Sequence, residues 1–308
     1  MTIPYPRYIR MVATRRCNLA CHYCHLEGEE RSTRESKELP LPVLISCIRV
    51  AARAGVRKFK LVGGEPFLRR DLPAAVGAIR EAAKDADISI ITAGVVSLAE
   101  LDAALEAGLD RVNVTIHGFT PTAMASRVSS PRAWETRSEF VDGVIARGLS
   151  PKLNYVFSGP EDLEDLDALL DFAAAHGLLV NVLDNLAIDG MSWRDVARAV
   201  RQLRGEPDRV EIDPDPYSLP TQHWSYLDEL RVEIKHTELG RIAPYSFCRE
   251  CAHRGHCREG VWALRLGTDG VLAPCLHRRD LGVPLARIAL DRGEDAAFEA
   301  WYGLEEAA

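Results

Sequence analysis

Short apolar runs alternate with longer amphipathic stretches through the first two thirds of the chain. The stretch 42–54 has its apolar residues at helical spacing, and Gly55 behind it is typical of a helix end. The run 58–62 then predicts a short buried strand. The same alternation continues to residue 205. The expected strands are 8–13, 58–62, 88–92, 111–116, 151–157 and 178–183, and the expected helices are 42–54, 71–84, 98–107, 133–147, 163–175 and 192–203.

Apolar strands that alternate with amphipathic helices are typical of parallel βα units. Six such units with right-handed crossovers curl into a partial or full barrel, or form an open doubly wound sheet. In all of these arrangements, ligands bind at the carboxyl ends of the strands. The fold class is therefore α/β, and chemistry is expected in the loops that follow the strands.

The pattern changes after residue 205. The stretch 205–220 is rich in Pro and Asp and is interpreted as a linker, and 230–236 and 239–242 are expected as short strands. A cysteine-rich region follows at 248–275. We therefore expect three parts, with boundaries at 1–205, 206–243 and 244–308, the last ending in a helix.

Composition limits the classes of function. The chain has 308 residues, 47% of them hydrophobic, which is enough for a sizeable core. The formal net charge of -7 gives no general attraction to nucleic acid. No apolar run of about 18 residues and no apolar N-terminal segment is found, so neither a membrane span nor an export signal is expected. Eight cysteines in such a chain favour metal ligation in the cytoplasm over disulfides.

Three cysteines follow the first expected strand. Cys17, Cys21 and Cys24 have the spacing C-x3-C-x2-C. Three thiolates are one too few for the four irons of a [4Fe–4S] cluster, which leaves one iron open to another ligand. The alternative is a zinc site, with His22 or His25 as the fourth ligand.

A second motif, Gly63-Gly64-Glu65-Pro66, closes the next strand. The two motifs together resemble the radical S-adenosylmethionine (SAM) superfamily. The resemblance implies a partial (β/α)6 TIM-like barrel whose open iron is chelated by SAM. It implies that the reduced cluster cleaves SAM to a 5′-deoxyadenosyl radical, which takes hydrogen from a substrate. It also implies an electron donor such as flavodoxin or ferredoxin.

Further strand ends resemble the SAM-binding motifs of that family, with two departures. Ala93 stands where the family has asparagine, and His117 stands where it has aspartate. The alternative for each position is an ordinary polar strand end. The resemblance implies cofactor contacts from the second motif, Gly63, Gly64, Glu65 and Pro66, and from Tyr23, Thr92, Asn113, Thr115 and Asn154.

The second cysteine region supplies four more thiolates. Cys248, Cys251, Cys257 and Cys275 fit either structural zinc or a closed [4Fe–4S] cluster. Next to a radical SAM motif, we favour a second, auxiliary cluster in a small C-terminal subdomain of the SPASM/twitch kind. The run 268–270 predicts a hairpin turn that returns Cys275 towards the other three.

The segment around Cys275, R-L-x-x-D-G-x-L-x-P-C-L, resembles the C-terminal region of the GTP 3′,8-cyclase family of molybdenum-cofactor biosynthesis. This resemblance extends over about residues 4 to 290. In that family a basic set holds the triphosphate. The matching positions here are Arg10, Lys58, Lys152 and Arg265.

Three departures point to a changed substrate. Ala263 replaces a family arginine, Cys257 is an additional cysteine, and Ala307-Ala308 replaces a Gly-Gly tail. We therefore expect hydrogen abstraction from an anionic nucleoside-, nucleotide- or sugar-like small molecule. The alternatives are the GTP 3′,8-cyclase reaction, a peptide-modifying radical SAM enzyme, and a non-catalytic Fe–S or zinc module. No catalytic side chain is assigned.

Overall fold

The protein is described here from a computed structural model. The description covers residues 7–21, 23–25, 27, 38–128, 130, 132–212, 220–236, 245–257 and 260–306, with the backbone alone for 256 and 304–306.

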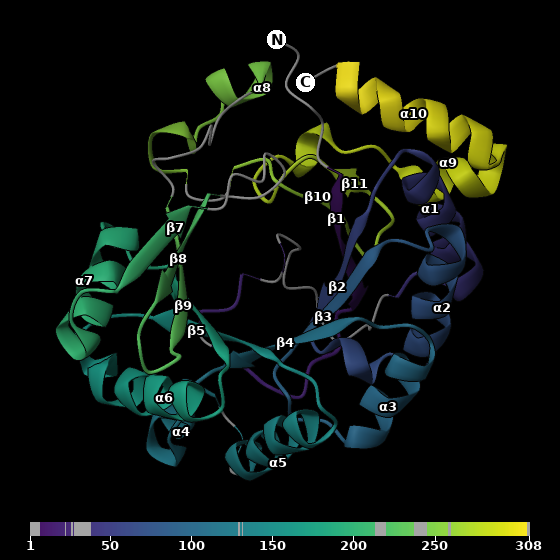
Figure 1. Ribbon diagram of the computed structural model, residues 1–308. Coiled ribbons are helices and arrows are strands. Elements are labelled where there is room, and N and C mark those ends of the chain that lie inside the picture. Colours follow the sequence, from purple (N-terminus) through teal and green to yellow (C-terminus); the bar gives the residue numbers. More distant parts are fainter. Residues whose placement is uncertain are drawn as a thin grey trace.

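Eleven strands form one sheet in the order β11-β10-β1-β2-β3-β4-β5-β6-β9-β8-β7, and they curl into a ring with helices on the outside (Figure 1). The first six strands are mutually parallel, which confirms the partial barrel. They are β1 Tyr8–Thr14, β2 Lys58–Gly63, β3 Asp87–Thr92, β4 Arg111–Ile116, β5 Lys152–Phe157 and β6 Leu179–Asp184. The helices between and after them are α1 Leu41–Arg53, α2 Leu72–Ala82, α3 Leu98–Glu106, α4 Pro121–Arg127, α5 Ala133–Ala146, α6 Leu163–Ala175 and α7 Trp193–Arg204.

The chain beyond α7 extends this sheet at both ends. β9 (Arg231–Lys235) pairs parallel with β6, and β8 (Thr221–Ser225) and β7 (Arg209–Ile212) follow it antiparallel. Part of the stretch interpreted as a linker is therefore strand β7. The expected strand at 239–242 lies outside the described residues.

The C-terminal region returns to the first strand. β10 (Leu264–Leu266) pairs parallel with β1, and β11 (Leu272–Ala273) pairs antiparallel with β10, as the predicted hairpin requires. The short helix α8 (Ser246–Arg249) precedes this hairpin. α9 (Leu285–Arg292) and α10 (Glu294–Glu306) follow it and pack against α1 (Figure 1). Residues far apart in the sequence, on β1 and β10, are thus neighbours.

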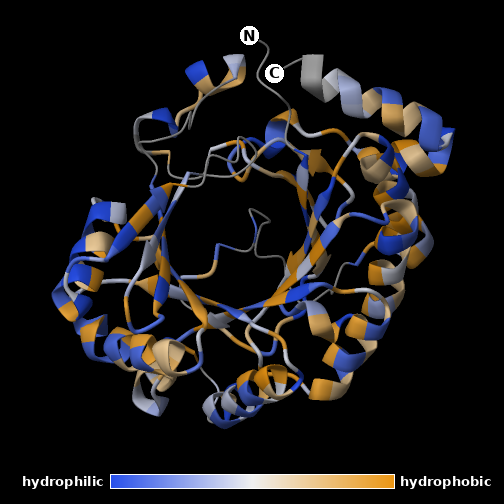
Figure 2. Ribbon diagram, in the orientation of Figure 1, coloured by the Kyte–Doolittle hydropathy of each residue, from blue (hydrophilic) through white to orange (hydrophobic). Residues whose placement is uncertain are grey.

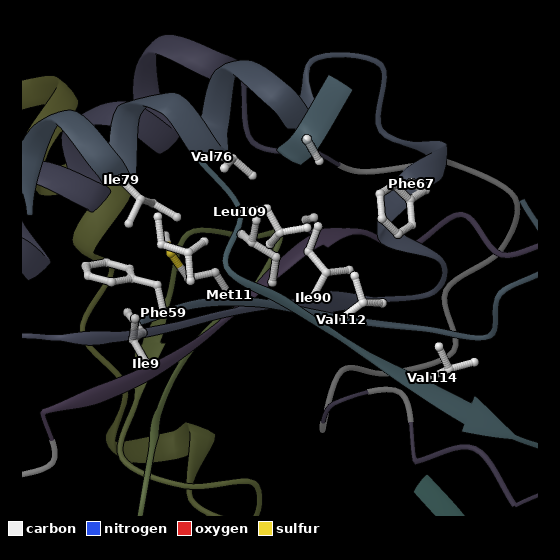
Figure 3. Packing of buried hydrophobic residues seen from close by; sticks show 14 of the residues in the cluster. Ile9, Met11, Phe59, Phe67, Val76, Ile79, Ile90, Leu109, Val112 and Val114 are labelled. Atoms are coloured by element: carbon white, nitrogen blue, oxygen red, sulfur yellow. The ribbon is translucent and has the colours of Figure 1, made fainter. Parts of the chain in front are cut away.

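The main core lies between the outer face of the sheet and the helices. Successive strand side chains point to opposite faces, and on β1 and β2 the outward residues are Ile9, Met11, Phe59 and Leu61, all fully buried. Figure 3 shows this layer packed against α2, and Figure 2 shows helices with a hydrophobic side and a hydrophilic side. The alternate strand residues therefore face the interior of the ring.

That inner face is charged. The interior of a closed TIM barrel is filled by apolar side chains, but here the inward positions carry ionisable groups. The cations include Arg10, Lys58, Lys60, Arg111, Lys152 and Arg265, and the strand carboxylates include Asp87 and Glu233.

Candidate active site

The Gly63-Gly64 turn lies directly against the backbone that leads into the first cysteines. Gly64 N–H donates to Thr14 O and Glu65 N–H donates to Arg16 O, each at 2.8 Å. A Cβ atom on Gly64 would lie 2.2 Å from Arg16 O, closer than any ordinary contact. The two glycines thus allow the turn to approach the backbone of the cysteine loop closely.

Glu65 joins the ends of β2 and β3. Its side chain is fully buried, and one carboxylate oxygen accepts from the Thr92 hydroxyl at 2.8 Å and from Ala93 N–H at 2.9 Å. The other oxygen accepts from Phe67 N–H at 3.2 Å. Burial raises the pKa of Glu65 to about 7 against the lowering effect of these donors. Both Glu65 and Thr92 are therefore engaged inside the protein, where they hold the strand ends.

The first three cysteines come together beside this turn. Cys17 and Cys24 are exposed and Cys21 is partly buried. Burial, and then the neighbouring Cys17 and Cys24 thiols, raise the pKa of Cys21 to about 12. Cys17 and Cys24 thus both oppose the ionisation of Cys21, and a bound metal would favour its thiolate form.

His117 is an unexpected member of the cysteine site. Its Nδ1 lies 2.5 Å from the Tyr23 hydroxyl and 3.6 Å from Cys21 Sγ. Burial, and then Arg137 and Arg127, lower the pKa of His117 to about 4, so the ring is neutral at pH 7. The sequence showed His117 as a departure from the family, but not its contacts with Tyr23 and Cys21.

The other expected cofactor residues lie on the inner face of β4 and β5. Thr115 and Asn154 are register partners, and Asn154 Oδ1 accepts from Asn181 Nδ2 at 2.9 Å. Asn113 is 3% exposed, and among the described residues nothing hydrogen-bonds to its Oδ1. An orphaned buried acceptor calls for an explanation, and a bound ligand with a donor group supplies one.

The four C-terminal cysteines line a single pocket, as expected from the hairpin. Within the described residues, no three His, Cys, Asp or Glu side chains are grouped closely enough to coordinate one metal ion. That holds for Cys17, Cys21 and Cys24 as well as for the cysteines of this pocket. The pocket is lined by Phe247, Cys248, Cys251, Arg254, Cys257, Gly260, Val261, Cys275, His277 and Arg278.

The four expected substrate cations all occupy the inner face, and three of them have carboxylate partners that sequence analysis missed. Arg10 and Arg265 both pair with Glu27, and Lys152 pairs with Glu233. Lys58, the fourth, lies close to Asp87 on the neighbouring strand.

Further residues complete this charged interior. Lys60 interacts electrostatically with Lys152, although β3 and β4 separate their strands in the sheet, so the two residues face each other across the ring. Burial is the first cause that lowers the pKa of Lys60. Burial would raise the pKa of Tyr8, but Lys60 and Arg10 lower it to about 8. The polar–apolar alternation within strands such as Arg111–Ile116 was the signal for these inward positions.

The comparison with known proteins identifies the family. A model of the radical SAM superfamily matches residues 11–173, which include the cysteine triad and the Gly-Gly-Glu turn. This chain belongs to the radical SAM superfamily.

Relatives are similar over nearly the whole chain. "Probable GTP 3',8-cyclase" of Methanocella arvoryzae is 28% identical over 275 residues, covering 88% of this chain and 82% of that protein. "GTP 3',8-cyclase" of Sulfurimonas denitrificans is 26% identical over 276 residues, covering 88% and 80%.

Two solved structures with bound S-adenosylmethionine share the fold. Streptococcus suis SuiB bound to S-adenosylmethionine has a TM-score of 0.61 at 15% identity over 88% of this chain, and this chain covers 60% of SuiB. anSMEcpe with bound AdoMet has a TM-score of 0.60 at 13% identity, covering 94% of this chain and 80% of that one.

The protein is thus an enzyme, and membership in the superfamily implies a [4Fe–4S] cluster and SAM. In the described part of the chain, no helix has the length and apolar character needed to span a bilayer. The individual ligands, the second cluster, the three-part division and the cytoplasmic location remain predictions.

Proposed function

We propose that the enzyme cleaves SAM at a cluster held by Cys17, Cys21 and Cys24, and acts on a purine nucleotide, with GTP as the first substrate to test. The charged inner face beside the cysteine loop carries this proposal. Six cations (Arg10, Lys58, Lys60, Arg111, Lys152, Arg265) face three carboxylates (Glu27, Asp87, Glu233), which leaves a net positive site for a polyanion. The relatives named GTP 3',8-cyclase support the choice of GTP.

The residues around the cysteine loop fit SAM and its cluster. When bound, the pair supplies a carbon-centred radical able to abstract hydrogen. This chain's residues would hold and shield it. Asn113 Oδ1 is available as an acceptor for a SAM donor group. The remaining proposed contacts are the backbone of the second motif, Gly63, Gly64, Glu65 and Pro66, and the side chains of Tyr23, Thr92, Thr115 and Asn154.

We assign a second [4Fe–4S] cluster to Cys248, Cys251, Cys257 and Cys275. Support comes from one pocket lined by four thiols, the number that closes a [4Fe–4S] cluster. Cys248, Cys251 and Cys257 lie between β9 and β10 in the chain and Cys275 follows β11. Cys275 interacts electrostatically with Arg265, so the pocket lies beside the basic set. With four thiolates the cluster would be fully ligated, so its role would be electron transfer or shaping of the substrate pocket.

A second candidate substrate is a less highly charged nucleoside- or sugar-like anion. Two observations favour it. Ala263 occupies a family arginine position, and Glu27 and Glu233 neutralise part of the basic set. A peptide substrate has weaker support. SuiB has also been solved bound to the precursor peptide SuiA, but at 13% identity the likeness to it is one of fold alone.

The deciding assay is anaerobic incubation of the iron-loaded protein with SAM, GTP and dithionite, followed by flavodoxin or ferredoxin as the reductant. We expect 5′-deoxyadenosine together with a cyclised GTP product, and neither product from Cys17→Ala. 5′-Deoxyadenosine that rises only with another anionic metabolite would favour the second candidate. A reconstituted protein that holds zinc and no iron would refute both.

A further inference from the structure

Glu27 is a carboxylate held between the two arginines of the basic set. Its side chain is 11% exposed. Arg10 Nε and Nη2 contact different oxygens of Glu27, at 3.1 and 2.5 Å, and Arg265 Nη1 contacts one of them as well. Glu27 therefore connects the cysteine loop to β1 and β10.

This geometry is the one that arginine uses for ligand anions. A guanidinium that donates through Nε and Nη2 makes two parallel hydrogen bonds to a carboxylate or a phosphate. Arg10 and Arg265 lie on neighbouring strands at register-paired positions, so both donate towards one point. The point between them is an anion subsite, and the protein's own Glu27 fills it.

The backbone of Glu27 is strained in this position. Its φ is +53°, in the left-handed region that non-glycine residues rarely adopt. Such strain persists only where surrounding contacts enforce it. Burial would raise the pKa of Glu27, but Arg10 and Arg265 outweigh it and hold the pKa well below its usual range. The Glu27 backbone N–H also donates to His25 Nδ1 at 3.2 Å. The Glu27 side chain is held by the two ion pairs, and a competing anion would remove them.

We propose that Glu27 is an internal counter-ion that the substrate's anionic group displaces from Arg10 and Arg265, so that Glu27 sets the charge selectivity of the site. This rests on the proposed function, since it concerns the same basic set. A single carboxylate balances one of two guanidiniums, so a monoanion gains little by replacing Glu27. A polyanion adds more negative charge between the arginines and replaces it more readily.

The test is calorimetric titration of the anaerobic, iron-loaded protein with tripolyphosphate and, separately, with methyl phosphate. In Glu27→Gln we expect tripolyphosphate to bind at least tenfold more tightly than in wild type, because its competitor has lost its charge. The affinity for methyl phosphate should rise by a smaller factor. The matched control is Glu38→Gln, since Glu38 pairs with Arg16 at 2.7 Å beside the same loop and should leave both affinities unchanged.

Two further variants keep the proposal open to refutation. Adding Arg265→Gln to Glu27→Gln should cancel the gain. If Glu27→Gln does not fold, Glu27→Asp takes its place. Aspartate keeps the charge but cannot span both arginines, so the affinity for tripolyphosphate should still rise, though by less than in Glu27→Gln. Unchanged or weaker tripolyphosphate binding in the Glu27 variants, or binding to none of the proteins, would overturn the proposal. The titration needs no turnover, so failure of GTP to react in wild type would count against the proposed function alone.

Discussion

The contact between the Gly64 turn and the cysteine loop predicts a severe effect of one methyl group. In Gly64→Ala the new Cβ would lie 2.2 Å from Arg16 O, 2.6 Å from Arg16 C and 2.8 Å from Arg15 O. All three are backbone atoms, so no side-chain rotation relieves the clash. The turn must separate from the cysteine loop until the contact reaches an ordinary distance of 3.4 Å or more.

The free-energy cost follows from that separation. A shift of about 1 Å lengthens the two 2.8 Å hydrogen bonds, Gly64 N–H to Thr14 O and Glu65 N–H to Arg16 O, beyond useful range. Losing them costs about 0.5–1.5 kcal/mol each, and overpacking adds about 1–3 kcal/mol. We therefore expect the free energy of unfolding to fall by about 2–6 kcal/mol.

The loss of bound iron should be confined to the first cysteine site. Urea unfolding measures stability, and iron analysis after anaerobic reconstitution measures cluster loading. Gly64→Ala should lose the iron of the first site, because its cysteines depend on this loop, and retain that of the second. Gly303→Ala is the control: Gly303 is exposed on α10 with nothing within 4 Å of an added Cβ, so stability should stay level or rise slightly.

The reasoning would be refuted by a Gly64→Ala protein with wild-type stability and a full complement of first-site iron. Such a result would mean that the turn and the cysteine loop do not need their close backbone contact.

Three further predictions concern the two cysteine sites. Folded Glu65 keeps its proton to about pH 7, whereas the unfolded carboxyl loses it near pH 4.5. The free energy of unfolding of the wild type should therefore fall by up to about 3 kcal/mol as pH rises between these values. In urea unfolding, Glu65→Gln should flatten this dependence on pH, and an equal dependence in both proteins would contradict the prediction. His117→Leu removes a ring nitrogen 3.6 Å from Cys21 Sγ and should lower the reduction potential of the first cluster in an EPR-monitored titration; an unchanged potential counts against the contact. Cys248→Ser should reduce iron from about eight to about four per chain and leave basal SAM cleavage intact; full iron retention would argue against the second cluster.

Local patterns determined the order of elements and the place of the first cysteines. The six strands and six helices expected between residues 8 and 203 appear within about one or two residues of their predicted bounds, because apolar spacing, Gly stops and short connections are local properties. The Cys17–Cys24 spacing and the Gly-Gly-Glu turn likewise needed no tertiary information to indicate the family.

Only the tertiary structure decided what the charged residues do. Arg10, Glu27 and Arg265 meet because β10 returns to pair with β1 more than 200 residues later in the chain. β7 to β9 were missed in part because the sheet, not local composition, recruits them. A sequence shows that cations alternate with apolar residues along strands. Only the curl of the sheet places those cations face to face across the ring and determines which carboxylates neutralise them.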